Sequence, residues 1–191
     1  MLTESDFLID LTPHGDARGY VMEAFRKSWV EDRGCHNDWV LEIQSYSAKK
    51  NTLRGMHFQI GAGAQAKLVR CIRGEIRDVI VDIRHGSPSF GKAFSFDLSA
   101  NKPQQLYVPR GFAHGFVTLC DDVELIYNLD NYYSRDAERG IRWNDSALAI
   151  DWKLTGEPVI SERDSVFPSL SETPAYFSVG DGPFAYRAER I

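Results

Sequence analysis

Two residues suited to binding an anion and moving a proton lie three positions apart in the stretch 52–59. Arg54 carries a guanidinium, the group that proteins most often use to bind phosphate and carboxylate. His57 carries an imidazole, which exchanges protons near neutral pH without special surroundings. Gly55 separates them within a mostly apolar run. The pattern predicts a site that binds an anion and transfers a proton. The alternative is a half-buried strand histidine beside a surface charge.

The spacing of this pair has a consequence for the strand that carries it. Residues three apart face opposite sides of a regular strand. If both side chains serve one pocket, the strand has to be irregular between them, and glycine within a strand often marks a bulge. We therefore predict an irregularity at Gly55–Met56, or an Arg54 side chain that reaches the rim of the pocket instead of its interior.

The composition favours one soluble domain that binds a small ligand. The chain has 191 residues, of which 43% are hydrophobic and 26% charged, as is typical of a globular domain. The net charge of −5 argues against nucleic acid as a partner, which requires a basic face, but a local cluster of cations can still bind a small anion. The N-terminus is acidic and does not resemble a signal peptide, and no apolar run approaches the roughly 20 residues of a membrane helix.

The cysteines indicate the compartment. There are three of them, and this odd number of widely spaced residues fits neither a disulfide framework nor a zinc site. Free thiols predict a reducing cytoplasm.

The elements that must position Arg54 and His57 read as strands. Short alternating apolar runs recur about every 8–12 residues with turn residues between them. They include 67–72, 94–98, 105–108, 113–119 and 123–129. No long amphipathic helix is present, so we expect an all-β sandwich or barrel with a few short helices, one within 27–37 and one turn at 136–139. The chain is expected to be a single domain, 1–191, with an irregular C-terminal tail at about 165–191.

A second histidine follows a turn in the segment 109–114, which has the spacing P-x-G-x-x-H. This spacing resembles the second half of the cupin signature, in which a strand histidine enters the lumen of a small β-barrel. The first half of that signature normally supplies further metal ligands, but here it reads His57-Phe58-Gln59, followed by Lys67. A lysine ammonium has no lone pair for a metal. The resemblance implies a cupin-like β-barrel, or jelly roll, without a metal. A metal-dependent cupin remains an alternative because His57 and His114 are both present.

Five motifs taken together resemble the dTDP-4-dehydrorhamnose 3,5-epimerase family in order and spacing over roughly residues 5–168. They are the segments 53–59, 67–70, 86–91, 109–116 and 143–145. The resemblance implies an isomerase that uses no cofactor and acts on a nucleotide-diphospho-4-keto-6-deoxy sugar. The expected substrate is the dTDP sugar on the route to L-rhamnose. Its 4-ketone acidifies the hydrogens on C3 and C5.

The same resemblance implies four catalytic roles. A histidine matching His57 removes the proton, and a carboxylate matching Asp164 hydrogen-bonds that histidine. A lysine matching Lys67 stabilises the enolate oxygen. A tyrosine matching Tyr127 returns a proton to the opposite face of the ring. Such an arrangement is chemically sensible, because one group acting on one face would restore the original configuration.

Further residues are implied in substrate binding. They are Arg18, Glu23, Arg54, Gln59, His114, Tyr132 and Arg163. In the family, Arg18 and Glu23 match residues that contact the nucleotide of a neighbouring subunit, which implies a homodimer formed by exchange of N-terminal strands. Tyr132 matches an aromatic residue that stacks on the base. The other arginines and the second histidine match groups near the diphosphate or the ketone oxygen.

Some alternatives stay open at this level. Tyr127 continues an apolar strand face and could be plain core, and Asp164 could cap a loop. Val21, Asn128 and the segment 41–45 depart from the family pattern, which leaves the nucleotide base and the extent of epimerisation undetermined. The rival functions are a 3-epimerase or a ketoisomerase on a related sugar, and a non-catalytic sugar-nucleotide binder.

Overall fold

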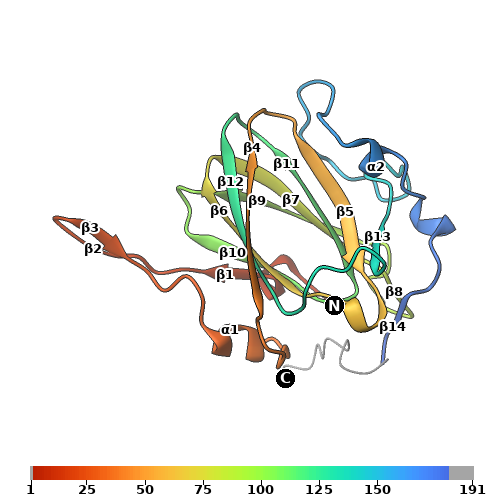
Figure 1. Ribbon diagram of the computed structural model, residues 1–191, viewed down its shortest axis with the longest axis horizontal. Helices are drawn as coiled ribbons and strands as arrows, with labels where there is room; N and C mark the ends of the chain where they lie inside the picture. Colours follow the sequence, from red (N-terminus) through yellow and green to blue (C-terminus); the bar gives the residue numbers. More distant parts are fainter. Residues whose placement is uncertain (1, 181–191) are drawn as a thin grey trace.

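The alternating runs form two antiparallel sheets that pack face to face in the computed structural model, which describes residues 2–180 (Figure 1). The first sheet has the order β1-β10-β6-β12-β4, with bounds Leu8–Asp10, Gln104–Val108, Lys67–Arg73, Val123–Leu129 and Leu41–Ser47. The second has the order β13-β5-β11-β7-β9, with bounds Glu138–Gly140, Leu53–Gln59, Phe112–Thr118, Glu75–Asp82 and Ala93–Ser99. The all-β prediction is therefore confirmed.

The remaining elements are short. They are the hairpin strands β2 (His14–Asp16) and β3 (Gly19–Val21), the parallel pair β8 (Arg84–His85) and β14 (Phe177–Ser178), the helices α1 (Lys27–Glu31) and α2 (Glu162–Ser165), and the single turns η1 (Glu4–Asp6), η2 (Gly61–Gly63) and η3 (Leu170–Glu172). The β2–β3 hairpin extends away from the two sheets as an arm (Figure 1). No helix among the described residues is long and apolar enough to cross a membrane.

The main core lies between the two sheets. The ring of Phe7 stands there, with its centroid 5.0 Å from Phe94 and 5.5 Å from Phe112. A second apolar cluster covers the outer face of the β5–β11–β7 sheet and includes Trp152 and Phe177 from the C-terminal segment. Every residue of β11 is consequently buried. Strands buried on both faces hold their side chains in fixed positions, which suits a site built on β5 and β11.

Two local predictions need correction. The turn predicted at 136–139 lies at 134–138, where the N–H of Glu138 donates to the carbonyl oxygen of Ser134, because Glu138 already begins the strand β13, which pairs antiparallel with β5. This pairing gives hydrogen-bond partners to backbone groups at the edge of β5. It is a tertiary contact, which local propensity does not predict. The residues 18–25 also have a pattern that predicts a strand, but only the three residues of β3 are in strand conformation. Of the predicted irregular tail, residues 165–180 include η3 and β14, and 181–191 lie outside the described residues.

The predicted irregularity in β5 is confirmed. His57 is paired with His114, and Arg54 is paired with Phe116. Three residues along β5, from 54 to 57, therefore correspond to two along β11, from 116 to 114. This extra residue brings Arg54 and His57 to the same side of the sheet. The Gly55–Met56 peptide is cis, and Gly55 has a φ of +132°.

Only glycine fits at this bulge. A Cβ atom at Gly55 would lie 2.5 Å from Cα of Gly115 and 2.9 Å from the carbonyl oxygen of His114. Both neighbours are backbone atoms of a strand buried on both sides, so displacing either of them would disturb close packing and cost free energy. The close approach of the two backbones therefore depends on the missing side chain.

We expect Gly55→Ala to lower the free energy of unfolding by about 2–5 kcal/mol, because it adds a backbone clash to an unfavourable positive φ. Gly61→Ala is the matched control. Gly61 also has a positive φ, +58°, but a Cβ atom there meets nothing within 4 Å, so its cost is limited to about 1–2 kcal/mol. Urea unfolding of both variants measures the difference. Equal losses would contradict a steric role for Gly55.

Candidate active site

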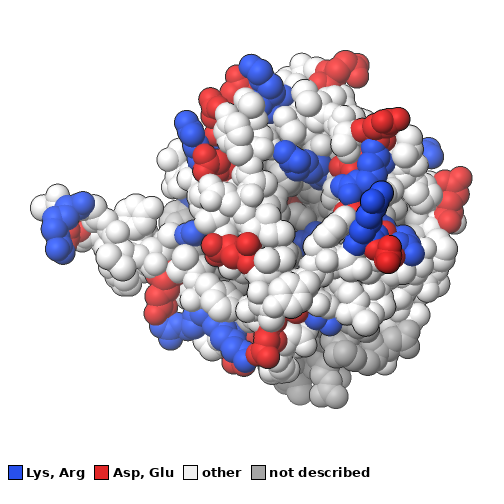
Figure 2. Space-filling model, viewed as in Figure 1, with Lys and Arg blue, Asp and Glu red and all other residues white. Residues whose placement is uncertain are grey.

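A cavity of about 600 Å³ opens between the two sheets. It is lined from β4, β5, β6, β11, β12 and β13, together with the segment 159–164. In the space-filling view this face is hollowed, and basic side chains stand beside the hollow (Figure 2). Arg54, His57, Lys67, His114 and Tyr127 all contribute to its lining.

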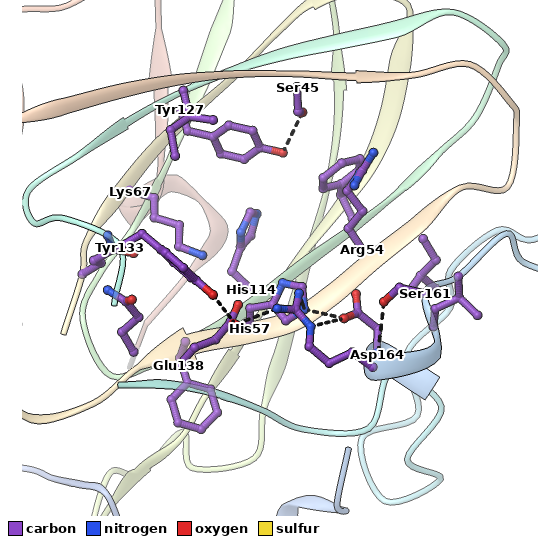
Figure 3. Close-up of a pocket in the computed structure, with 18 of the residues that line it drawn as sticks. Ser45, Arg54, His57, Lys67, His114, Tyr127, Tyr133, Glu138, Ser161 and Asp164 are labelled. Carbon is purple, nitrogen blue, oxygen red and sulfur yellow. Dashed lines mark hydrogen bonds and ion pairs between the residues drawn. The ribbon is translucent and has the colours of Figure 1, made fainter. Parts of the chain in front are cut away.

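His57 and Asp164 form a hydrogen-bonded pair at one side of the cavity (Figure 3). Nε2 of His57 lies 2.9 Å from Oδ1 of Asp164, and the backbone N–H of Gly55 donates to Oδ2 at 3.0 Å. An ionised carboxylate only accepts hydrogen bonds, so Nε2 carries the proton and Nδ1 carries the lone pair. The imidazole is therefore oriented as a base.

The surroundings of Asp164 keep it ionised. Burial opposes its charge, but the hydrogen bond and charge of His57, with contributions from Gly55 and Ser161, hold the pKa of Asp164 well below its usual range. The alternative that Asp164 caps a loop is wrong, because Ser161 is the N-cap residue of α2 and its Oγ accepts from the N–H of Asp164 at 3.1 Å. A fixed carboxylate behind His57 stabilises the imidazolium that forms when the base takes a proton.

Arg163 lies over this pair. Its Nε donates to Oδ1 of Asp164 at 3.2 Å, and its Nη1 donates to Glu138 at 2.6 Å. Nη2 lies 3.3 Å from Nε2 of His57, but Nε2 already donates to Asp164, so this contact is the approach of a cation and not a second hydrogen bond. Tyr133 donates its hydroxyl to the same Glu138 at 2.9 Å. These contacts connect the cavity mouth to the base.

Lys67 reaches the cavity from β6. Burial lowers the pKa of Lys67 to about 8, against the opposing pull of the negative charges of Asp78 and Glu138. Nearby, Nε2 of His114 lies 2.8 Å from Oδ1 of Asp78, and both residues are buried. Burial also lowers the pKa of His114, although Asp78 opposes this shift. At neutral pH the cavity therefore combines a cationic lysine with a second, carboxylate-paired histidine.

Tyr127 stands across the cavity from His57 (Figure 3). It comes from β12, packs against the main core and lines the cavity, so it is more than a core residue. Burial strongly raises the pKa of Tyr127, which keeps its hydroxyl protonated and able to donate. Oγ of Ser45, on β4, lies 3.5 Å from that hydroxyl.

Arg54 lies at the rim of the same cavity. Its Nη2 donates to the carbonyl oxygen of Tyr46 at 3.2 Å, and its Nε to Oγ of Ser47 at 3.4 Å. The side chain is exposed and lines the cavity. The bulge and the rim position thus occur together, although they were expected as alternatives.

Other predicted residues lie elsewhere. Gln59 lines the cavity but is buried. Its Nε2 donates to the carbonyl oxygens of Gly63 at 2.7 Å and Tyr132 at 3.1 Å, so it fixes the two loops that carry these residues. The side chain of Tyr132 is 64% exposed and is not part of the cavity lining, whereas Tyr133 is.

Arg18 and Glu23 belong to the N-terminal arm and its base. Arg18 pairs with Asp16, and Glu23 pairs with Arg26. Neither residue lines the cavity of its own chain.

Four cavity-linked residues escaped the sequence reasoning: Ser45, Asp78, Tyr133 and Glu138. Asp78 had a usable signal, because it stands beside the apolar run 79–81, where an unpaired charge would be costly. The other three had none, since their roles depend on strands that pair across long separations. Among the described residues, no three His, Cys, Asp or Glu side chains gather as a metal site.

Comparisons with known proteins agree with this geometry. A sequence model of the dTDP-4-dehydrorhamnose 3,5-epimerase family matches residues 4–172. A protein of that name from Sinorhizobium fredii (strain NBRC 101917 / NGR234) is 46% identical over 163 residues, which cover 85% of this chain and 84% of that one.

Solved structures are similar as well. The RmlC epimerase of Legionella pneumophila, in complex with dTDP-4-keto-L-rhamnose, matches with a TM-score of 0.83 and 37% identity, covering 88% of this chain and 89% of that one. ChmJ of Streptomyces bikiniensis, a 3'-monoepimerase in complex with dTDP-quinovose, matches with a TM-score of 0.79 and 32% identity over 86% and 83%. These matches confirm the cupin-like fold and identify the chain as an isomerase of the epimerase class. The chain belongs to the dTDP-4-dehydrorhamnose 3,5-epimerase family.

Proposed function

We propose that this protein epimerises a nucleotide-diphospho-4-keto-6-deoxy sugar at C3 and C5 without a cofactor. The substrate is dTDP-4-dehydro-6-deoxy-D-glucose and the product is dTDP-4-dehydro-L-rhamnose. Family membership supports the activity. The single observation that carries the mechanism is the placement of a carboxylate-backed base and a tyrosine on opposite sides of one cavity (Figure 3).

The reaction at each carbon uses three side chains. Nδ1 of His57 takes the proton next to the ketone, and the C–H electrons move into an enolate. The ammonium of Lys67 stabilises the enolate oxygen, since a fixed cation at a developing negative charge is usually the largest catalytic contribution. Tyr127 then donates its proton to the opposite face of the same carbon, which inverts its configuration.

The nucleotide-diphosphate is bound at the cavity mouth in this proposal. Arg54 and Arg163 offer their guanidinium groups to the diphosphate, as planar bidentate donors suit phosphate oxygens. His114 lies deeper and lines the part of the cavity that takes the sugar. The cavity lining supports Tyr133, more than Tyr132, as the aromatic that packs on the base.

We also infer a homodimer in which the N-terminal arm carries Arg18 and Glu23 into the cavity of the partner. The projection of the β2–β3 hairpin away from its own sheets supports this arrangement (Figure 1). The exposed apolar residues Tyr20 and Val21 on the arm, 68% and 78% exposed, suit a covered surface. The free thiols of Cys35, Cys71 and Cys120 support a cytoplasmic location.

A 3-epimerase is the second candidate function. The similarity to ChmJ, a 3'-monoepimerase, favours it. Both reactions use the same base and acid, so the residues of the cavity alone do not separate them. The two reactions are distinguished by the number of sugar carbons that exchange their hydrogen with solvent.

Proton NMR in deuterated water tests the proposed function. Wild-type protein given dTDP-4-dehydro-6-deoxy-D-glucose is expected to replace both the C3 and the C5 hydrogens with deuterium and to form the L-rhamno product. Label at C3 alone would support the 3-epimerase. The absence of deuterium at both C3 and C5 would contradict the proposed function.

The charge of Lys67 predicts a pH dependence. The ammonium form stabilises the enolate, and its pKa is lowered to about 8, so the active form is complete below that value and is lost as the pH rises through it. We expect kcat/KM to fall about tenfold per pH unit above about 8, since kcat/KM reports the ionisations of the free enzyme. Lys67→Arg is expected to remove this falling limb, because arginine stays charged. If kcat/KM of Lys67→Arg still falls above pH 8, the fall is caused by the ionisation of another group.

A further inference from the structure

The proposed reaction consumes the proton of Tyr127 each time it acts. In one inversion a C–H bond breaks as His57 takes its proton, and a C–H bond forms on the other ring face as Tyr127 gives one up. The site is left with an imidazolium and a tyrosinate. Before the next inversion His57 must release a proton and Tyr127 must gain one. The site therefore needs a route by which solvent returns a proton to Tyr127.

The wall around Tyr127 offers few such routes. Its cross-strand neighbours are Ile43 on β4 and Val69 on β6, and Leu129 follows it on the same face of β12. None of these side chains can carry a proton. A bound sugar also displaces water from the cavity, so the direct path from solvent closes while the substrate is present.

The ring of His114 also stands edge-on to Tyr127, with the centroids 6.4 Å apart, but its Nε2 is paired with Asp78. Ser45 is the neighbour whose hydroxyl faces that of Tyr127. Its Oγ lies 3.5 Å from the hydroxyl of Tyr127, which has no other hydrogen-bond partner within residues 2–180. This distance is long for an O–H···O bond, but catalytic hydrogen bonds often tighten only when substrate is bound. A serine hydroxyl donates one hydrogen bond and accepts others at the same time, which is the property that a relay requires.

The position of Ser45 on β4 connects it to solvent. β4 is the last strand of its sheet and pairs with β12 on one side only, among the described strands. Ser45 is partly exposed and lines the cavity, and Oγ of Ser47, on the same face of β4, lies 3.4 Å from Nε of Arg54 at the rim. Water at the rim can therefore approach Ser45 while the sugar occupies the deeper part of the cavity.

We propose that Ser45 relays a proton from water to the Tyr127 tyrosinate after each donation. Oγ of Ser45 gives its proton to Tyr127 and takes one from a water molecule, so Ser45 ends unchanged and solvent supplies the proton. This inference rests on the proposed function. Ser45 touches no reacting carbon, so it is a positioning residue that acts through Tyr127.

The test compares wild type, Ser45→Ala and Ser45→Thr, which keeps the hydroxyl. Initial rates are measured at fixed pH and ionic strength over a range of imidazole buffer concentrations. Regeneration of Tyr127 follows the first inversion, so Ser45→Ala is expected to lower kcat for the doubly inverted product about tenfold or more while leaving kcat/KM for the first inversion, followed as label uptake at the first carbon, within about twofold. Its kcat should rise toward the wild-type value as buffer is added, because the buffer acid replaces the relay. Ser45→Thr should behave as wild type without buffer.

A fall of kcat and kcat/KM by the same factor, with no response to buffer, would overturn the relay and leave Ser45 as a packing residue. Should Ser45→Ala fail to fold, Ser45→Cys is measured in the same way, since a thiol is a weaker donor and acceptor of similar size. The proposed function has its own readout. If wild type exchanges no hydrogen at C3 or C5, the epimerase proposal fails. If wild type exchanges both and Ser45→Ala shows no buffer response, only the relay fails.

Discussion

His57→Asn is expected to abolish hydrogen exchange at both C3 and C5 and to lower kcat by about 10⁴-fold, the upper range for loss of a general base. Asparagine keeps a polar group beside Asp164 but has no basic nitrogen. The dyad geometry supports a single base, because Nδ1 holds the only lone pair of the imidazole when Nε2 donates to Asp164 at 2.9 Å. Proton NMR in deuterated water measures the exchange at each carbon.

His36→Asn is the matched control for this prediction. His36 is exposed and does not line the cavity, so its loss should leave both exchange rates unchanged. Exchange that survives at one carbon in His57→Asn would mean that a second base serves that carbon. Exchange that survives at both would move the base away from His57.

Lys67→Met is expected to lower kcat by about 10²–10³-fold, corresponding to the roughly 2.7–4 kcal/mol that one preorganised donor at an oxyanion supplies. Methionine retains the apolar stem of lysine and leaves little cavity, so the variant isolates the missing charge. KM should change much less than kcat, because the enolate charge develops only in the transition state. Steady-state kinetics on the sugar nucleotide provides both constants.

Lys50→Met is the corresponding control, since Lys50 lies exposed on a turn outside the cavity. A loss in Lys67→Met that falls mainly on KM would assign Lys67 to ground-state binding of the substrate. Activity close to wild type would contradict its role at the enolate.

The strands were predictable because burial of one face produces alternation and burial of both faces produces a short continuous apolar run. The run around Ile80 is of the second kind, with Ile80 in the main core and Val79 and Val81 in the second cluster. The bulge at Gly55 was predictable as well, since it follows from requiring that Arg54 and His57 serve one site. In these cases local pattern and global fold agree.

The rest of the site depends on contacts that sequence patterns do not contain. Asp164 meets His57 across 107 residues, and only the family resemblance brought the two together. Glu138 was placed on a helical turn, but its strand pairs with β5 and points it at Arg163. The irregular segment after β12 places Tyr133 in the cavity lining and leaves Tyr132 outside it, a difference that no periodicity indicates. Register in such segments is set by tertiary contacts and not by propensity.

The most direct test of the two-sided mechanism is Tyr127→Phe in deuterated water, with label and configuration followed together by NMR. His57 can still remove a proton and return one to the same face, so we predict that deuterium enters while the configuration is retained. Net inversion should fall by about 10²-fold or more and label uptake by much less. Equal loss of label uptake and inversion, or inversion at the wild-type rate, would contradict the assignment of Tyr127 as the acid opposite His57.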